Sequence, residues 1–286
     1  MLLPQISDLQ INDFIVAALH EDVQGGDHTS QACIPANSRS RAVLKIKDYG
    51  VLAGVELAQR IFQHVDPDHS IKINLKDGAD VFYGQVAFEV EANTRALLKA
   101  ERLVLNTMQR MSGIATLASR FAFEVSDLPV KVLDTRKTTP MIRMLEKWAV
   151  KIGGCENYRW GLYDWIMIKD NHTDAAGGIT QAIEMVHAYQ KANNLQLGIT
   201  VEVRNLVELH QVLEIGGITR IMFDNFEIPI LAEAVATVEK RFETEASGGI
   251  SLQSIRKYAL SGVDYVSAGA LTHSALPLDL SLKIVQ

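Results

Sequence analysis

The sequence predicts an α/β protein whose C-terminal half forms a parallel sheet covered by helices. From residue 131 onward, short apolar segments alternate with longer amphipathic ones, which is the pattern of strands joined by helices. Polar, charged or glycine residues follow nearly every apolar segment, so functional groups gather where strands end. The predicted strands are KVLD (131–134), DWIMIK (164–169), ITVEV (199–203), RIMF (220–223), TEAS (244–247) and DYVSAG (264–269).

Amphipathic segments between these strands predict helices around 141–152, 179–191, 205–216, 228–242 and 251–260. Such an alternation either closes into a barrel or remains an open, doubly wound sheet. Functional groups after nearly every strand favour the barrel, because its C-terminal rim collects loops from all strands around one centre. An open sheet would concentrate them at a single switch point.

The first part of the chain predicts a smaller mixed region. A helix capped by Asp13 (FIVAALHED) is expected to end at Gly25-Gly26, where the missing side chain permits a left-handed turn. A long helix is expected from Thr94 to about Ser126, with a kink or break at Ser112-Gly113. Alternating apolar residues predict half-buried strands at 41–47, 70–76 and 85–91.

Composition and charge narrow the classes of function. The chain has 286 residues, 48% of them hydrophobic and 22% charged, which suits a folded globular protein. A net charge of -6 argues against non-specific nucleic-acid binding, which depends on lysine and arginine. Since we find neither a signal-peptide pattern nor an apolar run of membrane-spanning length, we expect a cytoplasmic protein with no membrane segment.

A cluster of cations indicates a local anion-binding site in this acidic chain. The segment from Asp134 to His172 carries more basic than acidic residues, at irregular spacings around turns. Arginine can bind a carboxylate through two hydrogen bonds, and lysine acts as a point charge. One alternative is that Lys169 forms a Schiff base, as in barrel aldolases. The cations are Arg136, Lys137, Arg143, Lys147, Lys151, Arg159 and Lys169.

Two glycine-containing turns predict phosphate binding. Ser247-Gly248-Gly249 joins a predicted strand to a helix, so that free backbone amides and a helix N-terminus can meet a phosphate. An ordinary turn is the alternative for this motif alone. Ser267-Ala268-Gly269 follows the next strand, and the last two strand loops of such barrels often bind phosphate.

Glu202 and Asp224 end neighbouring predicted strands, so their carboxylates would face one cavity. They could bind ribose hydroxyls, hold Mg²⁺ through water, or stabilise a cationic transition state. Ion pairs with the cation cluster, or an acid-base pair, are the alternatives. His172 and His273 lie beside strand ends, where either could orient a substrate.

The residues singled out above also carry a resemblance to a known family. The chain resembles the quinolinate phosphoribosyltransferases, also called carboxylating nicotinate-nucleotide pyrophosphorylases, over almost its whole length. The matching segments are EDVQGGDHTS (21–30), ERLVLNTMQRMSGIAT (101–116), DTRKTTPMIRMLEKWAVKIGG (134–154), NYRWGLYDWIMIKDNH (157–172), VEVRNL (201–206), MFDNF (222–226), EASGGI (245–250) and SAGALTHSA (267–275).

The resemblance implies a fold and an assembly. Residues 1–115 would form an N-terminal α/β sandwich domain and residues 116–274 an incomplete α/β barrel of the type II phosphoribosyltransferase kind, with the tail 275–286 packing on the first domain. It also implies a homodimer in which Arg102 of one subunit reaches the quinolinate site of the other.

The resemblance implies a reaction as well: quinolinate and phosphoribosyl pyrophosphate give nicotinate mononucleotide, pyrophosphate and CO₂, with Mg²⁺. Lys137, Lys169, Glu202 and Asp224 would be catalytic, and Glu202 and Asp224 would hold the metal. The implied substrate-binding residues are Arg102, Thr135, Arg136, Lys137, Tyr158, Arg159, Lys169, Glu202, Asp224, Ser247, Gly248, Gly249, Ser267, Ala268 and Gly269.

One position departs from the family pattern. The family has Asn-His-Arg where this chain has Asn157-Tyr158-Arg159. Tyrosine can donate a hydrogen bond to a carboxylate but cannot carry an imidazolium charge. Two competing interpretations are a related protein that accompanies molybdenum uptake and a non-catalytic metabolite-binding protein on the same scaffold.

Overall fold

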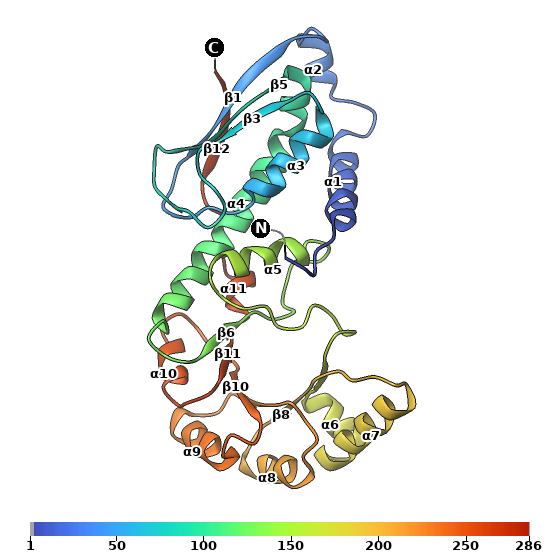
Figure 1. Cartoon of the computed structure of the whole chain (residues 1–286), viewed down its shortest axis with the longest axis vertical. Helices are drawn as coiled ribbons and strands as arrows, with labels where there is room; N and C mark the ends of the chain where they lie inside the picture. The colour runs from blue at the N-terminus through green and yellow to red at the C-terminus, as the bar shows by residue number, and fades with distance from the viewer. Residues whose placement is uncertain (1–2, 286) are drawn as a thin grey trace. The chain divides into compact units, whose positions relative to one another are not determined.

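The computed structural model describes residues 3–285, which divide into two compact units (Figure 1). The first unit extends to Ser119 and includes Thr139–Gly154 and the segment from Ala275 onward. The second comprises Arg120–Thr138 and Cys155–Ser274. As folding domains, the ranges 1–115 and 116–274 stay a prediction.

An antiparallel sheet forms the centre of the first unit, with strand order β12-β1-β5-β3. Its strands are β1 (Arg39–Ile46), β3 (Ser70–Ile73), β5 (Val86–Asn93) and β12 (Leu280–Val285), so the three strands predicted here are confirmed. The C-terminal strand β12 pairs with β1 along six residues, from Leu280 to Val285. Two short strands, β2 (Gly50–Val51) and β4 (Asp80–Val81), pair separately.

The helices of this unit are α1 (Asp8–Val23), α2 (His28–Cys33), α3 (Val55–Val65), α5 (Arg143–Ile152) and most of α4 (Thr94–Glu124). Helix α3 packs on the sheet, where the rings of Phe62 and Phe88 meet edge to face at 6.0 Å. The predicted cap at Asp13 is wrong. Ser7 accepts from the Gln10 backbone amide, and the Gln10 side chain accepts from Ser7, a capping box that starts α1 six residues earlier.

The predicted break at Ser112-Gly113 is also wrong, because α4 is a single helix of 31 residues. Ser112 turns its hydroxyl to the backbone of Ala53, accepting from its amide and donating to its carbonyl. A side chain at Gly113 would meet the carbonyl oxygen of Leu276 at 2.0 Å. The two small residues therefore permit close packing within a continuous helix.

A parallel sheet of six strands forms the second unit, in the order β6-β11-β10-β9-β8-β7. All six predicted strands are present: β6 (Lys131–Leu133), β7 (Ile166–Ile168), β8 (Ile199–Val203), β9 (Arg220–Asp224), β10 (Glu243–Ser247) and β11 (Tyr265–Ser267). Among residues 3–285 the edge strands β6 and β7 do not pair with each other, so the barrel is incomplete, as predicted.

Helices cover the outer face of this curved sheet (Figure 1). The inner face holds an apolar cluster of Leu133, Tyr158 and Met222, with Trp165, Met167 and Tyr265 packed against it. Two helices of this unit, α6 and α11, were not predicted. The segment 141–152, predicted as a barrel helix, is α5 and belongs to the first unit. The helices of the second unit are α6 (Asp170–Ala176), α7 (Ile179–Ala192), α8 (Leu206–Ile215), α9 (Ile228–Val238), α10 (Ile255–Ala259) and α11 (Ala270–His273).

Candidate active site

A cavity of about 700 Å³ lies at the C-terminal ends of the parallel strands. Because residues alternate between the two faces of a strand, the inward positions of neighbouring strands converge here. All the lining residues belong to the second unit. The sequence-predicted residues that line it are Thr135, Arg136, Lys137, Tyr158, Arg159, Lys169, Asp224, Ser247, Gly248, Gly249, Ser267 and Gly269.

Two arginines bring positive charge to the cavity lining. Among residues 3–285, the buried Nε of Arg136 has no hydrogen-bond partner. Arg159 donates to the Trp165 carbonyl oxygen at 3.3 Å. Burial, together with the neighbouring Arg136 guanidinium, lowers the pKa of Arg159. A bound anion would relieve the repulsion between these cations and satisfy the unused donor.

A lysine and two carboxylates form the next part of the site. Lys169 Nζ lies 2.6 Å from Glu202 Oε2, and Glu202 Oε1 accepts from the Asp170 amide at 3.3 Å. Glu202 is therefore ion-paired, as the alternative interpretation expected, and it does not itself line the cavity. The same pair argues against a Schiff-base role for Lys169, because that chemistry needs an unpaired, desolvated amine.

Asp224 faces the cavity at the end of β9 and is held by its neighbour. The Asn225 side-chain amide donates to Asp224 Oδ2 at 2.8 Å. Burial and the negative charge of Glu202 raise the pKa of Asp224. The carboxylates of β8 and β9 thus repel each other, as the arginines do, and favour a positively charged ligand between them.

The first glycine loop depends on close backbone packing. Gly248 has φ of 96°, and a side chain there would meet Asn225 Oδ1 at 2.2 Å. Gly249 also has a left-handed φ, 58°. The expectation that this loop leads directly into a helix is wrong, because α10 begins only at Ile255. A turn in which the Ser254 hydroxyl accepts from the Ser251 amide intervenes.

The second loop leads directly into helix α11. A side chain at Gly269 would meet Lys137 Cδ at 2.9 Å, so this glycine lets the lysine pass across the loop. Thr272 donates to the Lys137 carbonyl oxygen at 2.8 Å, which ties the two segments together. Ala268 is buried and does not line the cavity, so its contact with substrate stays a prediction.

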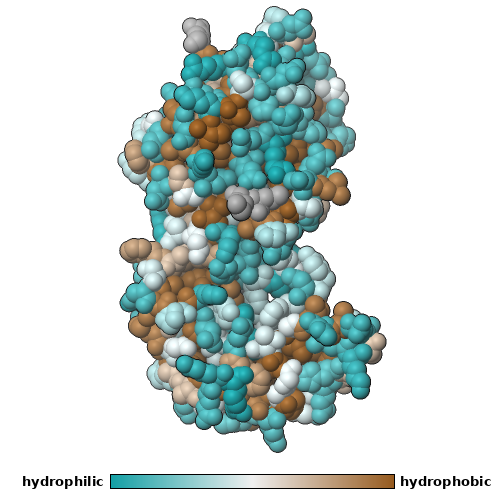
Figure 2. Space-filling model, viewed as in Figure 1, coloured by the Kyte–Doolittle hydropathy of each residue, from teal (hydrophilic) through white to brown (hydrophobic). Residues whose placement is uncertain are grey.

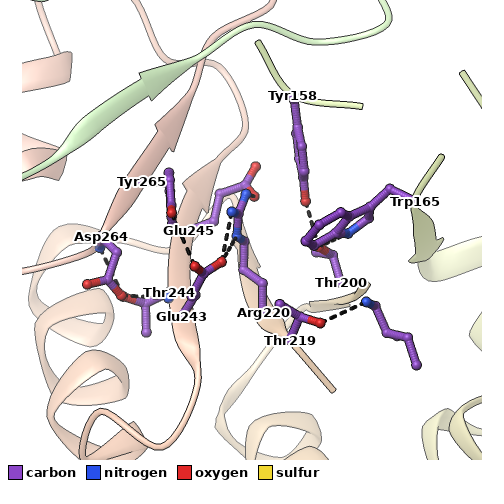
Figure 3. A network of polar contacts seen from close by, with 11 residues as sticks. Tyr158, Trp165, Thr200, Thr219, Arg220, Glu243, Thr244, Glu245, Asp264 and Tyr265 are labelled. Carbon is purple, nitrogen blue, oxygen red and sulfur yellow. Dashed lines mark hydrogen bonds and ion pairs between the residues drawn. The ribbon is translucent and has the colours of Figure 1, made fainter. Parts of the chain in front are cut away.

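Beneath the cavity lies a buried polar network that sequence reasoning missed (Figure 3). Arg220 from β9 donates to Glu243 at 2.8 Å and to Glu245 at 3.1 Å. Its guanidinium lies 3.7 Å from the centroid of the Tyr265 ring and 4.9 Å from that of Tyr158. Burial raises the pKa of Glu245, whose carboxylate also lines the cavity. The sequence did contain one indication of this network, because charged residues occur inside the otherwise apolar strand segments.

Tyr158 does not use its hydroxyl as expected. The hydroxyl lies 2.6 Å from the Thr200 hydroxyl, and Figure 3 shows it directed at Thr200 from above. The Trp165 indole donates to the same threonine oxygen at 2.9 Å. Tyr158 nevertheless lines the cavity, with its hydroxyl engaged below by Thr200.

Arg102 lies in the other unit, where it lines a separate recess of about 550 Å³ with Lys47, Tyr83 and Lys283. Of the two histidines, His273 lines the main cavity, whereas His172 does not; its ring accepts from the Lys169 amide at 3.0 Å. The lining residues outside the predicted substrate-binding set are Met167, Met222, Asn225, Glu245, Ile250, Ala270 and His273.

Converging cations, paired carboxylates and glycine loops on an open parallel barrel define an enzyme of anionic, phosphorylated substrates. Residues 27–112 match the family model for the N-terminal domain of quinolinate phosphoribosyl transferase, and residues 114–283 match the model for its C-terminal domain. The chain belongs to the quinolinate phosphoribosyltransferase family.

Similar proteins span most of this chain and of their own length. Quinolinate phosphoribosyltransferase [decarboxylating] 1b of Nicotiana tabacum is 45% identical, over 94% of this chain and 81% of the relative. The probable nicotinate-nucleotide pyrophosphorylase [carboxylating] of Bacillus subtilis is 38% identical, over 98% of this chain and 95% of the relative. The crystal structure of NadC from Streptococcus pyogenes superposes with a TM-score of 0.91 at 35% identity, covering 99% of this chain and all of the other.

Proposed function

We propose that this chain transfers the phosphoribosyl group of phosphoribosyl pyrophosphate to quinolinate, with loss of CO₂, and so makes nicotinate mononucleotide for de novo NAD biosynthesis. The observation that carries the proposal is one cavity lined by a cation pair, Arg136 and Arg159, and by Asp224, which forms a carboxylate pair with Glu202 outside the lining. The first pair suits a pyridine dicarboxylate, and the second suits a ribose whose C1 becomes cationic.

The cations would bind and orient quinolinate. The two guanidiniums can each grip a carboxylate, and Lys169, held at 2.6 Å from Glu202, adds a fixed positive charge. Holding the ring nitrogen against C1 of the ribose removes much of the entropic cost of bringing two substrates together. Thr135 and Lys137 lie at the same rim.

The carboxylates would act on the transition state. As the bond from C1 to the pyrophosphate oxygen breaks and the bond from C1 to the ring nitrogen forms, positive charge develops on the ribose. Glu202 and Asp224 would stabilise that charge more than the neutral sugar, so they would lower the barrier. Lys137 would stabilise the departing pyrophosphate, and the loops at Ser247–Gly249 and Ser267–Gly269 would hold the 5′-phosphate.

The donor set suits Mg²⁺. Asp224 and Glu202 offer hard carboxylate oxygens, and Glu202 raises the pKa of Asp224, a repulsion that a divalent cation would relieve. Glu202 and Asp224 would hold the ion, through water. When bound, Mg²⁺ would neutralise the growing charge on pyrophosphate.

Decarboxylation follows from the alkylated ring. Once the nitrogen carries the ribose, the ring is cationic and stabilises the electron pair left at C2 when CO₂ departs. That carbon then takes a proton, which completes nicotinate mononucleotide. The chain would contribute by excluding water from C1 of the ribose and by keeping the remaining carboxylate paired with an arginine.

Assembly and location are part of the proposal. Arg102 would complete the cavity of the partner subunit in a homodimer, because it lines a recess of mixed charge in the unit that does not hold the cavity. We place the enzyme in the cytoplasm, although relatives in Nicotiana tabacum and Arabidopsis thaliana are named as mitochondrial and chloroplastic. Within residues 3–285, every helix is too short or too polar to cross a bilayer.

Product formation tests the function directly. Purified protein with quinolinate, phosphoribosyl pyrophosphate and Mg²⁺ should form nicotinate mononucleotide and release CO₂, with nicotinate as the control substrate. Tyr158→His, measured alongside, reports what the substitution at this position has changed. Turnover of nicotinate in place of quinolinate, or of neither acid by either protein, would contradict the assignment.

A further inference from the structure

Tyr158 is held by Thr200, Trp165 and Arg220, which do not line the cavity, and by Glu245, which does. Its ring lines the cavity and its hydroxyl lies 2.6 Å from the Thr200 hydroxyl. Thr200 is fully buried on β8 and is absent from the cavity lining. We propose that Thr200 is a positioning residue, which fixes Tyr158 so that its ring, and not its hydroxyl, faces the bound pyridine carboxylate. The identity of that ligand rests on the proposed function.

Trp165 makes this arrangement specific. An indole N–H can only donate, so Thr200 Oγ1 accepts from Trp165 at 2.9 Å. A threonine hydroxyl has a second lone pair and one proton, which leaves it free to bond the Tyr158 oxygen as well. The rings of Tyr158 and Trp165 meet edge to face, 6.2 Å apart. Rotating Tyr158 would therefore leave the buried hydroxyls of Tyr158 and Thr200 without each other as hydrogen-bond partners, and it would break the contact between the Tyr158 and Trp165 rings.

Arg220 supports the tyrosine from a second direction. Its guanidinium lies 4.9 Å from the centre of the Tyr158 ring and is itself fixed by Glu243 and Glu245 (Figure 3). Burial and the negative charge of Glu245 raise the pKa of Tyr158, so the hydroxyl stays neutral. The cavity thus meets an uncharged aromatic surface at this point, backed by a guanidinium.

This geometry has a consequence for specificity. A hydroxyl engaged with Thr200 does not compete with the arginines for substrate carboxylates. The ring instead offers a flat surface suited to a planar heteroaromatic acid, and its contribution depends on its angle. Thr200 sets that angle and should influence the acid substrate far more than the phosphoribosyl donor.

Thr200→Val tests the inference, because valine keeps the shape and removes the hydroxyl. We expect the KM for quinolinate to rise about tenfold, since Tyr158 and Trp165 lose a buried partner, while the KM for phosphoribosyl pyrophosphate stays within about twofold. Thr200→Ser, which restores the hydroxyl, should recover most of the loss. In a Tyr158→Phe background, Thr200→Val should add little, since there is no tyrosine hydroxyl to hold.

Thr244→Val is the matched control. Thr244 is also a buried threonine in this sheet, and its hydroxyl bonds Asp264 at 2.7 Å, outside the cavity lining. The Thr244→Val substitution should lower the melting temperature and leave the KM for quinolinate unchanged. Equal, purely thermal effects of both valine variants would overturn the inference, and so would a full Thr200→Val effect in the Tyr158→Phe background.

Crystal structures of the wild type and Thr200→Val separate this inference from the proposed function. A displaced Tyr158 ring in the variant supports the positioning role, and an unmoved ring refutes it, whichever acid the enzyme uses. Failure of the wild type to form nicotinate mononucleotide would refute the proposed function alone.

Discussion

At the scale of the residue, the site contains two pairs of side chains with like charge. Arg136 and Arg159 repel each other in the cavity lining, and Asp224, which also lines the cavity, is repelled by Glu202 outside the lining. Asn225 holds the carboxylate of Asp224 and Lys169 holds that of Glu202, but the single lysine charge does not neutralise both carboxylates. Such groups are preorganised for charges that develop during reaction, because they need not reorient when those charges form.

Lys169→Ala should abolish turnover without unfolding the protein. Losing one preorganised charge in an active site lowers kcat by about 100-fold or more. The fold should survive, because the Lys169 side chain is 42% exposed and Glu202 still accepts from Asp170. Initial rates and a thermal melt check both statements.

Arg204→Ala provides the control for this prediction. Arg204 follows the neighbouring strand, is also 42% exposed and is ion-paired, but it does not line the cavity. Its loss should leave kcat essentially unchanged. A fully active Lys169→Ala protein would refute the role given to this lysine.

At the scale of the element, small residues inside a helix were misinterpreted, because the local sequence pattern predicts a break where the tertiary structure has close packing. Ser112 and Gly113 read as a break because glycine weakens a helix. In the structure they bring α4 against Ala53 and Leu276, and the helix continues unbroken. The strands were easier to predict, since their alternating or continuous apolar residues reflect burial directly.

Gly113→Ala should therefore destabilise the protein although alanine favours helices. The gain in helix propensity is about 1 kcal/mol. The methyl group would meet the Leu276 carbonyl at 2.0 Å, and forcing such an overlap in a packed site costs about 1–3 kcal/mol or more. Denaturant unfolding should show a net loss of stability.

Gly25→Ala is the matched control, because nothing lies within 4 Å of the added carbon. It should leave the free energy of unfolding nearly unchanged. If Gly113→Ala were as stable as this control or more so, the close approach of the C-terminal segment to α4 would be wrong.

At the scale of the whole molecule, the position of Arg102 raises the question of how a site is completed. It lies in the first unit, with the recess that also contains Lys47 and Lys283, whereas the cavity belongs to the second. The dimer proposed above resolves this if Arg102 acts in the partner. Arg102→Ala should then weaken quinolinate binding more than phosphoribosyl pyrophosphate binding, as titration calorimetry would measure.

Mixed dimers test the sharing of sites. We expect Arg102→Ala and Lys169→Ala to be nearly inactive as separate homodimers. Co-expressed with different tags and purified through both, each mixed dimer would hold one intact and one doubly defective site, so about half of wild-type activity should return. Mixed dimers without activity would place Arg102 in the site of its own subunit, or outside any site.

The sequence by itself determined the alternation of strands and helices and the groups at the strand ends, whereas the incomplete barrel was implied by the resemblance to the family. The first two follow from the period of apolar residues and from turn chemistry, which are local, and Arg136, Lys169 and Asp224 were visible as charges beside apolar runs. The prediction at Asp13 missed the start of α1, which Ser7 caps together with Gln10.

Only the tertiary structure decided the support of the site. The Tyr158 hydroxyl meets Thr200 across 42 residues, and Arg220 meets Glu245 across 25. These contacts depend on the strand order β6-β11-β10-β9-β8-β7, which sets which strand ends are neighbours. Burying a charged side chain costs free energy unless a partner is brought next to it. Here the partners are distant in the sequence, so no local sequence pattern predicts which residues will meet.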